Sequence, residues 1–248
     1  MDRATTRDDG ADRRGGRRGD ASLSALLVVQ CLTLFVAIPV GAAHPIGRVL
    51  LDASHLAFAA TCAVALTRRG AVRGALLAAV ALLAAAPIVE LRAGARLGTG
   101  VSALREAIAL VAFGFNALVT ALVARRVFGP GRVGAHRVQG AVLVYLNVAA
   151  LFAIAYGVLE AHAPGAIVAS GTGALAVGPI PPGARTAGLT YFSLATLTTT
   201  GYGDLVPVHP LARSLANVEA VFGQLYPATL LARLVSLQLA QGGPRERH

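Results

Sequence analysis

Six apolar segments, each close to the length needed to cross a bilayer, dominate this chain of 248 residues. A helix rises about 1.5 Å per residue, so about 20 apolar residues span the hydrocarbon core. Polar or arginine-bearing breaks separate the segments. The pattern predicts an all-α membrane protein with six transmembrane helices, at residues 21–43, 49–67, 74–91, 107–124, 138–159 and 211–239.

The composition supports a membrane environment. Hydrophobic residues make up 55% of the chain and charged residues only 14%, whereas soluble domains carry about a quarter charged residues. Unpaired charge is expensive in hydrocarbon, so a lipid-embedded protein needs such a deficit. A soluble nucleic-acid-binding protein could also carry the net charge of +10. The net charge alone therefore does not separate the two classes of protein. The positions of the charges do, and from them we expect the lipid bilayer, and no nucleic acid, as a partner.

The arginines indicate the orientation in the membrane. All 22 basic residues are arginine, and with the N-terminus inside, fifteen of them fall in cytoplasmic stretches and six in outer stretches. Cytoplasmic loops are usually enriched in basic residues. This distribution predicts a multi-pass membrane protein with both termini in the cytoplasm.

The first 20 residues combine arginine, aspartate and glycine with almost nothing apolar. Such a segment buries too little surface to fold, so we expect a disordered cytoplasmic tail at 1–20. An alternative is that the tail and the first apolar segment form a signal peptide, cleaved near Gly41-Ala42-Ala43. The apolar run is longer than that of most signal peptides, which favours a retained helix.

A different kind of segment lies between the last two apolar runs. Residues 164–182 are rich in glycine and proline and read as an exposed loop. Residues 190–198 are too short to cross a membrane, and they suit a re-entrant helix enclosed by protein or water. The following Thr-Thr-Gly-Tyr-Gly has no carboxylate. It offers a cation backbone carbonyls and threonine hydroxyls, and its glycines allow backbone angles that other residues resist.

The segment from Thr196 to Asp204, Thr-Leu-Thr-Thr-Thr-Gly-Tyr-Gly-Asp, resembles the signature of the potassium channel superfamily. The preceding Tyr191-Phe192-Ser193 resembles the pore helix of its bacterial members, in the family with one pore loop between two helices. The resemblance implies that four chains surround one axis and that rings of oxygens replace the hydration shell of K⁺. It thus implies a homotetramer in a bacterial membrane, with K⁺ as the permeant ion and no cofactor. The residues implied at the ion sites are Thr199, Thr200, Gly201, Tyr202 and Gly203.

The same resemblance divides the chain and assigns supporting residues. Residues 21–127 would form a four-helix membrane region, and residues 128–248 a pore domain with the re-entrant helix and filter between the last two helices. Thr198 and Asp204 would support the filter. The family more often has valine or isoleucine at Thr200, and some members have glutamate at Ala195. These two departures leave a weakly selective cation channel as an alternative.

The last apolar segment contains three further candidate residues. Gly223 follows Asp204 at a spacing that resembles the hinge glycine of pore-lining helices. Together with Pro227 it predicts a local bend, because both residues weaken a helix. Glu219, an acid at membrane depth, could concentrate cations, brace the pore helix or be a protonated or hydrogen-bonded structural group.

Several other functions are disfavoured by the sequence. Voltage sensing requires repeated arginines on a membrane helix, and residues 107–124 contain none. No nucleophile and base lie in a pattern that suggests an enzyme, and no paired inverted repeats with broken helices suggest a transporter. A non-conducting membrane sensor or scaffold with a pore-like fold remains the alternative from another class.

Overall fold

The computed structural model describes residues 23–43, 53–54, 56–58, 60–62, 70, 74, 78–79, 81, 100–129, 135–170, 178–181 and 184–241. The predicted tail at 1–20 lies outside the described residues. Most of the predicted spans 49–67 and 74–91 also lie outside them, and their described residues are helical.

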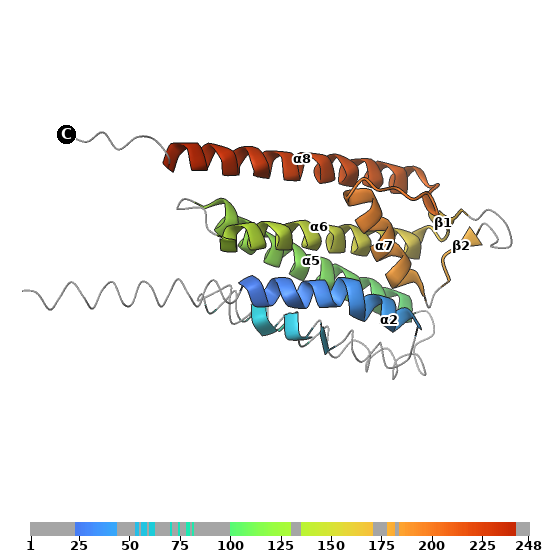
Figure 1. The fold of residues 1–248 in the computed structure, drawn as a ribbon. Helices are drawn as coiled ribbons and strands as arrows, with labels where there is room; N and C mark the ends of the chain where they lie inside the picture. The colour runs from blue at the N-terminus through green and yellow to red at the C-terminus, as the bar shows by residue number, and fades with distance from the viewer. Residues whose placement is uncertain are drawn as a thin grey trace, which may run out of the picture.

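The described part of the chain is mostly helical (Figure 1). An N-terminal helix starts at Leu23 and contains one π-helical turn, in which the Thr33 hydroxyl donates to the Val29 carbonyl at 2.8 Å. The remaining helices are α2 (Ile38–Ala43), α5 (Gly100–Phe128), α6 (Ala135–His162), α7 (Arg185–Leu197) and α8 (Pro210–Gln241). The helices predicted at 107–124, 138–159 and 211–239 are thus confirmed as helices, each longer than predicted.

Among the described residues, three helical segments are long and apolar enough to cross a membrane: Leu23–Gly41, Glu106–Phe128 and Arg137–His162. The segments agree with the first, fourth and fifth predicted spans. Helix α8 is long but is not among the three. The structure therefore supports a helical membrane protein, and the total of six spans stays a prediction.

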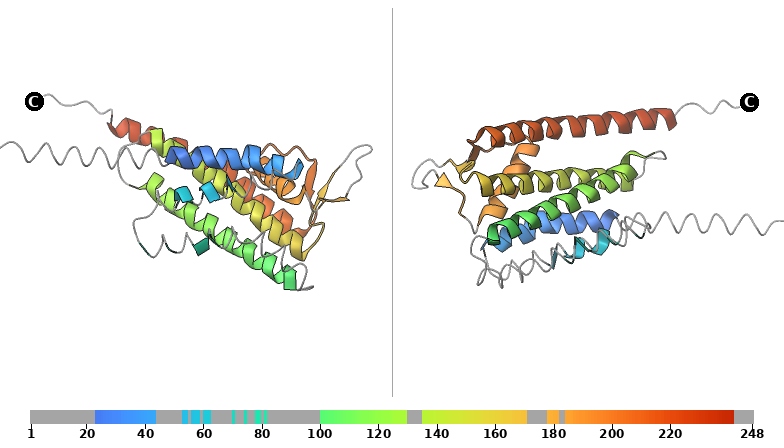
Figure 2. Two further views of the ribbon diagram at one scale, coloured as in Figure 1. Left: turned by 90° about the horizontal axis from the view of Figure 1, so that it is seen from below. Right: turned by 180° about the vertical axis from the view of Figure 1, so that it is seen from behind.

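The central core joins the N-terminal helix, α5 and α6. Leu26, Cys62, Val119, Val123 and Leu143 are all fully or almost fully buried in this cluster. Close packing here requires a small residue, because a Cβ at Gly140 of α6 would lie 2.6 Å from a methyl group of Val127 on α5. Helix α6 therefore packs against α5 on one side and against α7 and α8 on the other (Figure 2).

A small antiparallel sheet interrupts the helical architecture beside α7. Strand β1 (Ile167–Ala169) pairs with both β2 (Gly178–Pro179) and β3 (Leu205–Pro207). The prediction of an exposed loop at 164–182, and of a purely α fold, is wrong for this stretch. Glycine and proline dominate the segment, but its short run Ala166-Ile167-Val168-Ala169 can pair with the apolar strand after the Thr-Gly-Tyr-Gly motif, and Ala166 and Ile167 are buried.

The end of α6 is tied to this sheet by Glu160. Glu160 directly follows the span predicted at 138–159, and it is only 1% exposed. The carboxylate accepts backbone hydrogen bonds from Ile167 at 2.7 Å and from Gly165 at 3.2 Å. A buried acid is tolerated where such donors satisfy it, and here it fixes the start of β1.

Candidate ion-conducting site

Helix α7 lies between α6 and α8 (Figure 2). It has 13 residues, which corresponds to about 20 Å and is too short to cross a bilayer. Its buried residues include Leu189, Phe192, Ser193 and Leu197. Phe192 packs edge-on against Tyr156 of α6, with ring centroids 5.0 Å apart. The segment predicted at 190–198 is helical, and its helix begins five residues earlier and ends at Leu197. A re-entrant course through a membrane stays a prediction.

The C-terminal end of α7 is held by both neighbouring helices. The carbonyl of Leu197 accepts a hydrogen bond from the Tyr145 hydroxyl of α6 at 2.8 Å. On the other side Gly223 of α8 lies so close that a Cβ there would be 1.8 Å from the same carbonyl oxygen. The last peptide of α7 is therefore fixed in space.

The segment 198–204 that follows, named the filter motif, turns its first backbone N–H groups toward α7. The amides of Thr200 and Gly201 donate to the Ala195 carbonyl at 2.9 and 3.1 Å, and the amide of Thr199 donates to the Thr196 carbonyl at 2.9 Å. No cis peptide bond is present among the described residues. In a trans peptide the carbonyl points opposite to the N–H, so the carbonyls that precede these three amides point away from α7.

Every second residue of this segment has a left-handed backbone. The φ angles are 57° at Thr199, 53° at Gly201 and 79° at Gly203. Glycine adopts positive φ without steric cost, which explains two of the three positions. Thr199 is β-branched and strained in this region, and such strain concentrates at functional sites.

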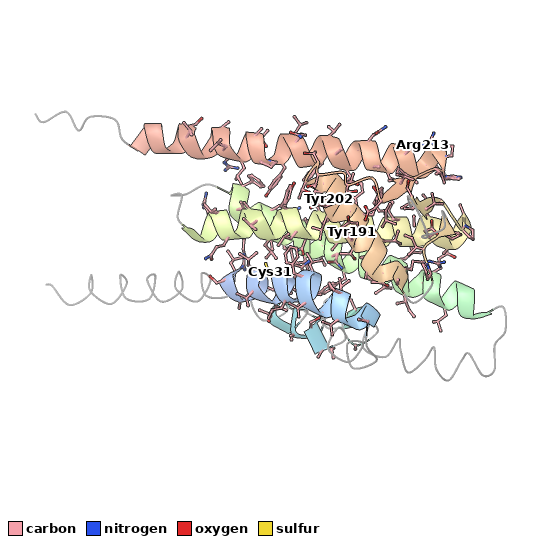
Figure 3. The ribbon with its side chains drawn as sticks, turned by 45° about the vertical axis from the view of Figure 1, so that its right-hand side comes forward. Cys31, Tyr191, Tyr202 and Arg213 are labelled. Carbon is pink, nitrogen blue, oxygen red and sulfur yellow. The ribbon has the colours of Figure 1, made fainter. Side chains whose placement is uncertain are left out.

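Asp204 holds the C-terminal end of the motif. Its carboxylate accepts from the Leu205 amide at 3.1 Å and lies near the hydroxyl of Tyr191 of α7. The Tyr191 ring also stacks on Tyr202, with centroids 6.0 Å apart and planes 9° from parallel (Figure 3). The Asp204 carbonyl accepts from the Ser170 amide at 2.7 Å, which joins the motif to the sheet.

Threonine hydroxyls cluster at the N-terminal end of the motif. The Thr198 hydroxyl lies 2.7 Å from the Leu194 carbonyl and 2.9 Å from the Thr200 hydroxyl. The unusual Thr200 thus has a polar partner within the motif. The Thr199 hydroxyl accepts a hydrogen bond from the Gln224 amide of α8 at 3.0 Å.

Glu219 is fully buried behind α7. It accepts from the Tyr156 hydroxyl at 2.7 Å and forms a short hydrogen bond with the Ser193 hydroxyl, which also lies 2.8 Å from the Ala149 carbonyl. One hydroxyl proton cannot serve both acceptors of Ser193, so all groups are satisfied when Glu219 is protonated and donates to Ser193. These bonds link α6, α7 and α8. They are compatible with a brace and with a hydrogen-bonded structural group, and the role of Glu219 stays a prediction.

Helix α8 is continuous through the residues predicted to bend it. Pro227 lies inside the helix, and a hinge at 223–227 stays a prediction. The contact of Gly223 with Leu197 is a second reason why this position requires glycine, because no side chain fits between the two backbones.

Comparison with known proteins agrees with this geometry. A family model described as an ion channel matches residues 166–238. The inward rectifier potassium channel Kirbac3.1 of Paramagnetospirillum magnetotacticum is 36% identical over 85 residues, which cover 33% of this chain and 23% of the relative. The match thus spans about a quarter of the curated relative's length. No solved structure matches.

The family match and the relative point to an ion channel and not to an enzyme. The similarity, which covers about a third of the chain, supports membership of the potassium channel superfamily. The matched region contains β1, α7, the filter motif and most of α8, which are the elements that carry the candidate site.

Sequence reasoning missed several residues that position the site. Tyr145 and Tyr156 of α6 both reach α7 or its partners. They lie 11 residues apart, close to three helical turns, so they share one face. Two hydroxyl-bearing rings on one face of an apolar helix were the available signal. Gln224 could have been noticed in a similar way, because it is a polar amide within an apolar segment and directly follows Gly223.

We predict that Glu219→Gln leaves stability nearly unchanged, because an amide can donate to Ser193 and accept from Tyr156. Glu219→Leu leaves the buried Tyr156 hydroxyl without its acceptor, which costs about 1–3 kcal/mol, whereas Ser193 keeps the Ala149 carbonyl as its acceptor. Thermal unfolding of the purified protein in detergent measures the difference. A loss in Glu219→Gln as large as that in Glu219→Leu would contradict the protonated brace.

We predict that Gly223→Ala strongly destabilises the contact between α7 and α8, since the new methyl group meets backbone and not a movable side chain. Overpacking of this kind costs about 1–3 kcal/mol or more. Gly114→Ala in α5 is the matched control, because nothing lies within 4 Å of the position that a Cβ would take there. A purely flexible hinge would instead leave the unfolding temperature of Gly223→Ala like that of the control.

Proposed function

We propose that the chain is a subunit of a potassium-selective channel that conducts K⁺ passively down its electrochemical gradient. The observation that carries the proposal is the direction of the motif's peptides. Its amides from Thr199 to Gly201 bond to α7, so the preceding carbonyls face the opposite side. An array of carbonyl oxygens on one side of a strand is the ligand set that a dehydrated alkali cation requires.

The proposed oxygen ligands belong to the residues that the sequence analysis assigned to the ion sites. We assign the ion sites to the carbonyls of Thr199, Thr200, Gly201 and Tyr202, with the Thr199 hydroxyl at the inner end and Gly203 completing the outer end. The alternation of positive φ at Thr199, Gly201 and Gly203 supports this assignment, because it separates the segment from an ordinary strand.

The proposal requires four copies of the chain, because one filter strand supplies only one side of each ion site. The Tyr202 side chain is 72% exposed in the single chain. Helix α8 also exposes large apolar residues next to the motif, including Val218, Val221 and Leu225. A homotetramer would cover part of these surfaces, which supports the expected assembly.

The orientation in the membrane is proposed on two grounds. The described chain begins and finishes at the same end of the helical bundle (Figure 1), and the arginines favour a cytoplasmic location for that end. The filter motif then lies nearer the outer side. We propose a bacterial plasma membrane as the host, from the family resemblance and the lysine-free composition.

Steep voltage gating is not part of the proposal. Helix α5 carries Arg125 and Arg126 in its last turn, and residues 106–124 contain no arginine. Since each charge must cross the membrane field to contribute, this helix offers no ladder of gating charges.

A weakly selective cation channel is the second candidate. The specific observation in its favour is the bond between the Thr198 and Thr200 hydroxyls, which places a polar link where the family more often has an aliphatic side chain. A non-conducting sensor or scaffold would show no flux at all.

We predict that Gly201→Ala abolishes K⁺ flux. Positive φ costs an L-residue about 1–2 kcal/mol, so alanine at φ 53° favours rotation of the peptide that carries the Thr200 carbonyl. K⁺ efflux from liposomes containing the purified protein measures the loss. The matched control is Gly157→Ala in α6, whose Cβ would make an ordinary 3.9 Å contact with Leu189.

Two results would count against the proposal. Wild-type protein that moves Na⁺ as readily as K⁺ would favour the weakly selective channel. Equal K⁺ flux through wild type and Gly201→Ala would show that ions do not pass along this backbone.

A further inference from the structure

Among the described residues, Gln224 is the one polar side chain of α8 that donates a hydrogen bond to the filter motif. Its Nε2 donates to the Thr199 hydroxyl at 3.0 Å. It follows Gly223, whose backbone lies against the Leu197 carbonyl. The close approach at Gly223 therefore fixes the position of Gln224 relative to Thr199, the first residue of the proposed ion sites.

The carboxamide has capacity beyond this bond. A glutamine has two N–H donors and one carbonyl acceptor. One N–H is used by Thr199, and no partner for Oε1 is found among the described residues. Both Gln224 and Thr199 are exposed in the single chain. The free oxygen thus belongs to a side chain that is anchored at one atom and open to solvent.

The bond also constrains the Thr199 hydroxyl. Its oxygen has two lone pairs, and the amide proton of Gln224 occupies one of them. The other lone pair remains for a cation. The pair Thr199–Gln224 therefore presents two kinds of oxygen, a hydroxyl and an amide carbonyl, at the same level of the chain.

This level is the inner end of the motif. Asp204 at the other end leads into β3 and the sheet, whereas α8 continues past Gln224 toward the end of the bundle where the described chain begins (Figure 1). In the proposed orientation, an ion coming from the cytoplasm meets Gln224 just before Thr199.

We propose that Gln224 is an ion-contacting residue of the inner filter entrance. This inference rests on the proposed function, because only a tetramer brings four carboxamides around one axis. The ring of Gln224 oxygens receives a partly hydrated cation, while the bond from Nε2 to the Thr199 hydroxyl anchors each carboxamide. The ring sets the affinity of this entrance for cations, and the filter carbonyls set the selectivity for K⁺.

Block by Ba²⁺ is a suitable probe, because a divalent cation responds strongly to oxygen ligands and to added charge. K⁺ currents of the purified wild-type protein are recorded in a planar bilayer, with Ba²⁺ applied from each side in turn. Gln224→Met removes the amide at similar length, and Gln224→Glu keeps the reach and adds charge. Asn217→Ala, at an exposed polar position of the same helix, is the control.

We expect Gln224→Met to weaken block from one side by about tenfold, equivalent to about 1.4 kcal/mol, and Gln224→Glu to strengthen it by more than about tenfold. Block from the other side, the K⁺-to-Na⁺ selectivity and the behaviour of Asn217→Ala should not change. Equal block in all variants would overturn the inference and leave Gln224 as a brace. Loss of K⁺ selectivity in Gln224→Met would also overturn it, since the residue would then act only by positioning Thr199.

The outcome for the wild type separates this inference from the proposed function. If the wild type conducts K⁺ selectively and only the block is insensitive to Gln224, the inference alone fails. If the wild type passes no K⁺-selective current, the proposed function fails and the inference fails with it.

Discussion

Helix α7 is too short to cross a membrane, and this constraint shapes the rest of the C-terminal structure. The last carbonyls of a helix have no partner within the helix, so other groups must satisfy them. The amides of the filter motif take this role, since Thr199, Thr200 and Gly201 donate to carbonyls of the last turns of α7. The conformation of the motif is therefore a consequence of how a short buried helix ends.

The position of α7 depends in turn on groups from both neighbouring helices. Tyr156 and Glu219 hold its middle through Ser193, and Tyr145 and Gly223 hold its C-terminal end. The sheet anchors the segment after the filter, because Glu160 fixes β1 and β1 pairs with β3. The filter motif is thus supported at both of its ends and through the helix that precedes it.

The long described helices and the position of the motif could be predicted from the sequence. Both depend on local properties, the length of an apolar segment and a specific run of residues. Helices α6 and α8 differ from the predicted spans by only a few residues at each end. The sheet was missed because β1 is three residues long and its partner β3 lies beyond α7 and the filter motif in the chain. The burial of Glu160 was missed for the same reason, since its donors belong to a turn that the sheet creates.

The roles of single polar residues were only partly predictable. Glu219 was recognised as unusual, but its partners Tyr156 and Ser193 lie on two other helices. Gly223 was interpreted through its conformational freedom, whereas its contact with Leu197 depends on the packing of α7 against α8. Such contacts follow from the tertiary arrangement and leave no periodic pattern in one sequence.

The most direct measurement for the central claim is the reversal potential of the purified protein in a planar bilayer, with K⁺ on one side and Na⁺ on the other. A backbone filter that replaces the hydration shell of K⁺ predicts a reversal potential far toward the potassium equilibrium value. A robust current that reverses near zero would contradict the claim, because it would show that the carbonyls of this motif do not distinguish the two ions.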